Sequence, residues 1–257
     1  MIGLQNICVT FNAGTPDEAK IFDNFSFGVN KGDFVSIIGS NGSGKTTLLN
    51  LICGSISPDS GKIVFNGKDI TKMKEHRRAA FIGRVFQDPK LGTCGGLTVT
   101  ENMALADGKN RPFGLAPAVN RKNIDRYRAM LEECGMGLEN RMNVPAGQLS
   151  GGQRQALSLV MANMTPLDLL ILDEHTAALD PHSSEQIMIL TDRFVRSRGI
   201  TTLMVTHNLR FAAEYGNRIA LMHEGKFVLD RSDEEKRNTN IDDLLEVFNS
   251  ISIESGN

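Results

Sequence analysis

The 257-residue sequence has little net charge, few cysteines and no long hydrophobic run. Its formal net charge of −2 offers no general attraction to the polyanionic backbone of DNA or RNA, so we expect no nucleic-acid partner. No apolar run approaches the ~18 residues that a membrane-spanning helix needs, and residues 1–11 lack the basic and apolar segments of a signal peptide. The four cysteines are far apart, without a CxxC pair, which is typical of reduced thiols. We therefore expect a cytoplasmic protein.

What the sequence does contain is a series of short apolar runs that predicts an α/β fold. A helical stretch at Ser183–Arg198 lies between two such runs, as a βαβ crossover requires. Residues 46–53 also have helical spacing and end at Gly54, a natural C-terminal cap. The runs expected as strands are Leu4–Phe11, Asn24–Val29, Phe34–Ile38, Lys62–Phe65, Leu169–Leu172 and Thr201–Thr206.

From about residue 88 to residue 165 the spacing becomes helical, with no strong strand candidate. We expect a helical subdomain here, inserted into an α/β core of about residues 1–87 and 166–230. Residues 231–257 are expected to form a C-terminal helical tail, whose amphipathic stripe favours packing on the same domain over binding a partner. The stripe consists of Ile241, Leu244, Leu245, Phe248 and Ile251.

A glycine-rich loop at residues 39–46 has the pattern GxxxxGK[ST] and lies between an expected strand and an expected helix. Its glycines let consecutive N–H groups turn toward a phosphate, and the helix start presents its positive end to the same anion. Lys45 is expected to bridge the β- and γ-phosphates of a nucleotide, and Thr46 to supply a hydroxyl ligand to Mg²⁺. The expected phosphate-binding residues are Gly39, Ser40, Asn41, Gly42, Ser43, Gly44, Lys45 and Thr46.

A pair of acids follows the apolar run Leu169–Leu172. Asp173 is the candidate Mg²⁺ partner, because P-loop proteins hold the metal with a carboxylate at the end of a strand. Glu174 is the candidate general base for a water aligned with the γ-phosphate. Acids also cap strands and helices without any such role, but their place after a phosphate-binding loop favours catalysis.

The segment Leu149–Gln153, with the sequence LSGGQ, opens a helical stretch. Ser150 followed by Gly151 and Gly152 predicts either a second anion-binding helix start or a plain N-cap with a flexible lead-in.

Together these motifs resemble those of the nucleotide-binding subunits of ABC transporters, over about residues 2–230. LSGGQ at 149–153 matches the signature motif of that family without a change. The resemblance implies a P-loop NTPase (RecA-like) core with an N-terminal antiparallel β-subdomain and an inserted α-helical subdomain. It also implies an ATPase that uses ATP and Mg²⁺.

The resemblance implies roles for further residues. Gln87 resembles the Q-loop glutamine, which links the γ-phosphate and Mg²⁺ to the membrane partner, and His207 resembles the switch histidine that contacts the γ-phosphate. Phe11 falls where the family places an aromatic that stacks on adenine, and Phe22 is a competing candidate. The implied catalytic residues are Lys45, Gln87, Glu174 and His207. The implied nucleotide contacts outside the loop are Phe11, Thr47, Ser150, Gly151, Gly152, Gln153 and Asp180 of the D-loop.

The resemblance also implies partners. Two copies would face each other head to tail, so that ATP on Lys45 of one copy is covered by Ser150–Gln153 of the other. Separate permease subunits would span the membrane and hold the dimer at its inner face. A soluble ABC ATPase of chromosomes, DNA repair or ribosomes is the alternative.

One departure from the family is His175, which stands where most members have proline after the catalytic acid. We favour a structural role for it in the turn toward the D-loop over a role as a site residue. The stretch Asp173–Pro181, together with Gly83–Pro89, is similar to a subgroup of bacterial importer ATPases that accompany substrate-binding lipoproteins. We therefore expect import of a small solute such as an amino acid, with a substrate-binding protein in the same system.

Overall fold

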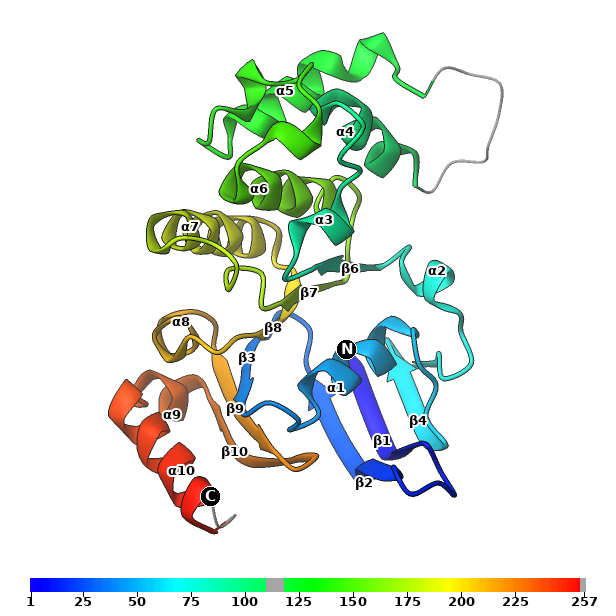
Figure 1. Ribbon diagram of the computed structural model, residues 1–257, viewed down its shortest axis with the longest axis vertical. Coiled ribbons are helices and arrows are strands. Elements are labelled where there is room, and N and C mark those ends of the chain that lie inside the picture. Colours follow the sequence, from blue (N-terminus) through cyan, green and yellow to red (C-terminus); the bar gives the residue numbers. More distant parts are fainter. Residues whose placement is uncertain (110–117, 255–257) are drawn as a thin grey trace. The chain divides into compact units, whose positions relative to one another are not determined.

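The computed structural model describes residues 1–109 and 118–254, and these residues group into two compact units (Figure 1). The first unit comprises Met1–Ala79 and the chain from Thr201 onward, and the second comprises Ala80–Ile200. The last residues of the expected tail, 255–257, lie outside the described part of the chain, as does the side chain of Ile251.

An antiparallel sheet forms the N-terminal part of the first unit, in the order β2-β1-β4-β5. Aromatic residues of β2 fill its buried face, and the rings of Phe22 and Phe25 stack at 4.5 Å. The strands are β1 (Ile2–Phe11), β2 (Ala19–Val29), β4 (Ser60–Phe65) and β5 (Lys68–Asp69). This sheet confirms the predicted N-terminal antiparallel β-subdomain.

A mixed group of strands forms the rest of the first unit. Strand β3 (Phe34–Gly39) pairs in parallel with β8 (Thr201–Val205) and with β9 (Arg218–His223), which pairs antiparallel with β10 (Lys226–Ser232). All residues of β3 and β8 are buried, which explains their uninterrupted apolar character. The accompanying helices are α1 (Lys45–Cys53), α2 (Glu75–Arg78), α8 (Leu209–Glu214), α9 (Asp233–Arg237) and α10 (Ile241–Glu254).

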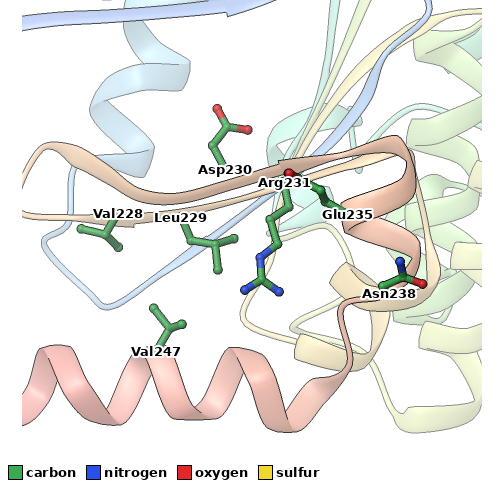
Figure 2. Close-up of a pocket in the computed structure, with 7 residues that line it drawn as sticks. All are labelled: Val228, Leu229, Asp230, Arg231, Glu235, Asn238 and Val247. Atoms are coloured by element: carbon green, nitrogen blue, oxygen red, sulfur yellow. The ribbon is translucent and has the colours of Figure 1, made fainter.

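The tail helix α10 packs on the first unit, as its amphipathic stripe predicts. Leu244 is fully buried in a cluster that includes Ile38 and Leu229, and Val247 and Phe248 pack against that cluster. Beside it, a surface pocket of about 700 Å³ lies between β10, α9 and α10. Figure 2 shows Leu229 and Val247 facing each other across this pocket.

The second unit contains a parallel strand pair and a group of helices. Strand β6 (Ile82–Val85) pairs with β7 (Leu169–Asp173), with Ile82 opposite Leu169. Helix α6 contacts α4, α5 and α7, and Figure 1 shows α6 beside α7. The helices are α3 (Pro89–Gly92), α4 (Val99–Gly108), α5 (Ile124–Glu132), α6 (Gly151–Ala162) and α7 (Pro181–Arg198).

Within the described residues, the stretch from 88 to 165 holds helices and no named strand, in agreement with its helical pattern. None of the helices described is both long enough and apolar enough to cross a membrane.

Candidate nucleotide-binding site

The glycine-rich loop runs from the carboxyl end of β3 directly into the start of α1. Only glycine fits at residue 39, because a Cβ there would lie 2.2 Å from the carbonyl oxygen of Met222. Gly42 and Gly44 have φ values of 80° and 106°, which other residues rarely adopt. The loop therefore depends on its glycines for its path.

Lys45 lies inside this loop and is only 5% exposed. Its ammonium donates hydrogen bonds to the carbonyl oxygens of Gly39 at 2.8 Å and Ser40 at 2.7 Å. Helix α1 begins at Lys45 without a side-chain cap, so its first N–H groups and its positive end face the loop. A fixed cation and a helix start at one loop make a site for phosphate.

The hydroxyl-bearing residues that follow differ in exposure. Thr46 is exposed, so its side chain is open to a ligand, and Thr47 is half-buried. In the loop itself, Ser40, Asn41 and Gly42 are exposed, while Ser43 and Gly44 are buried. Ser43 also accepts a backbone hydrogen bond from Gly225, which anchors the loop to the turn between β9 and β10.

The two candidate adenine-stacking rings lie in different environments. Phe11, at the end of β1, is 40% exposed, whereas Phe22 is fully buried. Phe22 stacks on Phe25, and a Cβ at Gly44 would lie 3.2 Å from its ring. Phe22 is therefore a core residue beneath the loop, and Phe11 is the ring with an open face.

His207 lies at the same edge of the first unit as the loop. It follows β8, which pairs in parallel with β3 through Ile37 and Val205. The carboxyl ends of neighbouring parallel strands meet at one edge, so His207 and the glycine-rich loop leave the strands on the same side. His207 is exposed, and the next residue, Asn208, caps α8.

The second unit carries the acids at the carboxyl end of its strand pair. Asp173 ends β7 and pairs with Arg84 of β6, with Nη2 and Oδ2 2.6 Å apart. The side chains of Arg84 and Asp173 are 15% and 16% exposed, and the Arg84 guanidinium lies over the ring of Phe86 at 4.8 Å. Arg84 was not predicted from the sequence; the signal that could have found it is a charged residue in the short run Ile82–Val85.

Gln87 and Glu174 follow these two strands. Gln87 is exposed, and the preceding carbonyl oxygen, of Phe86, accepts a hydrogen bond from Gln155 Nε2 at 3.0 Å. Glu174 is partly exposed and adopts a left-handed backbone conformation with φ of 47°. Because β6 and β7 are parallel, Gln87, Asp173 and Glu174 share one edge of the second unit.

The LSGGQ segment forms the start of α6. Ser150 is its N-cap, and a reciprocal pair of hydrogen bonds at 3.3 Å joins Ser150 and Gln153. Gly151 is exposed, and Gly152 is buried where a Cβ would lie 2.9 Å from Ser183 Oγ. The segment is thus a true N-cap, and its exposed serine and glycine stand at the positive end of the helix.

Asp180 and His175 lie beside α7. Asp180 is the exposed N-cap of α7, and hydrogen bonds from Ser183 hold the pKa of its carboxyl below the usual value. His175 is 2% exposed, and its Nε2 lies 3.2 Å from Thr191 Oγ1. Burial lowers the pKa of His175 to about 4. This histidine is therefore a buried neutral side chain that contacts α7.

The donors named for Mg²⁺ are the hydroxyl of Thr46, the amide oxygen of Gln87 and the carboxylate of Asp173. Oxygen donors of this kind are those that Mg²⁺ prefers, and the exposed Thr46 and Gln87 are accessible to it. The described residues contain no group of three or more His, Cys, Asp or Glu side chains able to hold a metal by themselves. This donor chemistry fits a metal that is bound with the phosphates of a nucleotide.

Residues 22–177 match the family described as ABC transporter. The tyrosine transport ATP-binding protein of Clostridioides difficile (strain R20291) is 44% identical over 248 residues, covering 96% of this chain and 98% of that protein. The ABC transporter ATP-binding protein YtrE of Bacillus subtilis (strain 168) is 34% identical over 232 residues, covering 88% and 96%. A dimeric post-hydrolysis state of the ATP-binding cassette MJ0796, bound to ADP and Pi, has a TM-score of 0.77 and 28% identity, covering 90% of this chain and 98% of that chain.

Proposed function

This chain belongs to the ABC transporter family, and from that premise we propose that it is the ATP-hydrolysing subunit of an importer for a small solute such as an amino acid. ATP binding and ATPase activity follow from the family itself. The observation that carries the nucleotide site is the loop at residues 39–46, whose buried Lys45 stands at an uncapped helix start. Import is supported by relatives named as import proteins, for methionine and for phosphonates.

The proposed chemistry is hydrolysis at the γ-phosphorus. Lys45 holds the β- and γ-phosphates, and His207 contacts the γ-phosphate. Glu174 accepts a proton from the attacking water as the bond from the γ-phosphorus to the bridging oxygen breaks, which yields ADP and phosphate. Thr46, Gln87 and Asp173 are the residues that would hold Mg²⁺. When bound, Mg²⁺ neutralises the charge that develops on the phosphate oxygens.

The proposed assembly is a head-to-tail dimer of this chain. Ser150–Gln153 and Asp180 of one copy would cover ATP bound on Lys45 of the other, which gives the exposed start of α6 an anion to bind. A dimeric cassette among the structural relatives supports this arrangement. We propose that the helical subdomain, about residues 88–165, and Gln87 engage separate permease subunits, which hold the dimer at the inner membrane face. A substrate-binding protein would deliver the solute.

The catalytic part of the proposal is tested with Glu174→Gln. ATP binding should persist while turnover falls by at least ~10²-fold, the scale of a lost general base. The same variant should form a dimer in gel filtration when ATP is added, and Ser150→Ala in addition should weaken that dimer more than it weakens ATP binding. Near-normal turnover in Glu174→Gln would place the base elsewhere, and the absence of an ATP-driven dimer would refute the head-to-tail arrangement.

The solute is tested by uptake of labelled tyrosine, the compound in the name of the relative at 44% identity. Cells of the source organism that carry Lys45→Ala should lose ATP-dependent uptake, whereas cells with the normal chain should retain it. If uptake is unchanged in the Lys45→Ala cells while the purified normal chain hydrolyses ATP, tyrosine is excluded as the solute and the assignment as an ATPase still holds.

A further inference from the structure

The turn after β7 holds Glu174 in an unusual backbone conformation. Its φ of 47° lies in the left-handed region, which costs energy for any residue other than glycine. A residue keeps such a conformation only when its surroundings impose it. Directly after it, the Ala177 N–H donates a hydrogen bond to the Glu174 carbonyl oxygen at 2.9 Å, which closes the turn. The direction of the Glu174 side chain therefore depends on what fixes this turn.

His175, the next residue, ties the turn to helix α7. Its imidazole is 2% exposed, and Nε2 lies 3.2 Å from the hydroxyl of Thr191, which is fully buried in α7. A second bond from the same helix supports the turn, because the Ser184 hydroxyl donates to the carbonyl oxygen of Thr176 at 3.0 Å. Two side chains of α7, a long helix of the same unit, therefore hydrogen-bond to this turn and hold it in place.

The hydrogen bonds of Thr191 determine which atom carries the proton. The Thr191 hydroxyl donates to the carbonyl oxygen of Ile187 at 2.7 Å, and this uses the single proton of that hydroxyl. Toward His175 the hydroxyl can therefore only accept, so the imidazole carries its proton on Nε2. The result is a directional bond from His175 to a fixed point on α7.

We propose that His175, through its hydrogen bond to Thr191, is a positioning residue that holds the Glu174 carboxylate where it accepts the proton of the attacking water. This inference rests on the proposed role of Glu174 as the general base. A base must lie within hydrogen-bond reach of the water, so a small rotation of the turn lowers the rate of hydrolysis while leaving the phosphate contacts of Lys45 intact.

The test compares Thr191→Val with Thr191→Ser in the full chain. Valine has the shape of threonine but cannot accept the proton of Nε2, whereas serine retains the hydroxyl. Thr191→Val should lower kcat for ATP hydrolysis by about tenfold or more, with KM and the affinity for ATP changed less than about twofold, because nucleotide binding is left intact. Thr191→Ser should keep kcat within about threefold of the parent. Equal losses in both variants, or no loss in Thr191→Val, would overturn the proposal.

A second comparison separates positioning from a general weakening of the fold. In a Glu174→Gln background there is no base left to position, so adding Thr191→Val should not reduce the residual rate further. A further reduction of about tenfold would assign the effect to structure and overturn the proposal. Normal turnover of Glu174→Gln alone would instead refute the proposed base. If Thr191→Val does not fold, His175→Leu and the donor-retaining His175→Gln make the same comparison from the other end of the bond.

Discussion

Lowering the pH should weaken the fold through His175, because its ring is buried in the neutral form. Burial lowers the pKa of His175 from 6.5 to about 4. Between these two values the unfolded chain binds a proton that the folded chain excludes. The stability that the neutral ring contributes is therefore complete above pH 6.5, is lost as the pH falls toward 4, and does not change further below that.

The size of the effect follows from the same two pKa values. One pKa unit corresponds to about 1.4 kcal/mol, so proton uptake by the unfolded chain between about pH 7 and pH 4.5 lowers the free energy of unfolding by about 2.5 kcal/mol. The carboxylates also make the free energy of unfolding depend on pH, but their contribution is the same in a variant that differs from the parent only at His175. His175→Gln removes the titrating group. Between about pH 7 and pH 4.5, the free energy of unfolding of this variant should therefore fall by about 2.5 kcal/mol less than that of the parent chain.

Urea unfolding followed by circular dichroism, in EDTA and without nucleotide, measures this difference at about pH 7 and about pH 4.5. His182→Gln is the matched control, because it removes an exposed histidine from the first turn of α7. The control should show the pH dependence of the parent. If His175→Gln also shows the parent's pH dependence, the claim that His175 is buried in its neutral form is refuted. The tautomer inferred from the hydrogen bonds of Thr191 is then refuted as well.

Other predictions concern binding and folding. Phe11→Ala should weaken ATP binding by about tenfold, the scale of one lost ring stack, without changing the unfolding midpoint; Phe22→Ala should instead destabilise the fold by about 3–5 kcal/mol. Arg84→Met should cost about 2 kcal/mol in urea unfolding, because it leaves a largely buried carboxylate unpaired, and Asp173→Asn in addition should restore part of that loss. Gly39→Ala should lower the affinity for ATP in calorimetry by at least about tenfold, since its Cβ meets a backbone carbonyl; an unchanged affinity would show that the loop shifts without cost.

The sequence predicted the fold where burial leaves a simple pattern. The apolar runs of β3, β7 and β8 were found because both faces of those strands are covered. The P-loop NTPase core is confirmed by the likeness to solved ATP-binding cassettes. Strand β6 was missed because Gly83 and Arg84 interrupt its apolar run, and β9 and β10 were missed because polar residues leave only short apolar runs within them. Strand β2 begins before its predicted start, since polar residues at 23 and 24 mask the pattern.

The candidate site was predictable to the extent that its parts are local in sequence. The conformation of the loop at residues 39–46 is determined by consecutive residues, so a sequence motif is enough to find it. To choose between Phe11 and Phe22 as the adenine-stacking ring, one must know how exposed each ring is. That exposure depends on how β1 and β2 pair. The contact between Arg84 and Asp173 joins residues 89 positions apart, through the pairing of β6 and β7, and no spacing rule predicts it.

In the proposed mechanism, ATP binding and ATP hydrolysis depend on contacts internal to different units of the chain. The loop around Lys45 is held by bonds within the first unit, whereas the turn that carries Glu174 is held by His175 and Thr191 within the second. Changes inside one unit therefore leave the internal bonds of the other intact. It follows that substitutions around Lys45 should act first on the affinity for ATP, while those at Thr191 should act on kcat. A variant at Thr191 that lost nucleotide binding before it lost turnover would contradict this division.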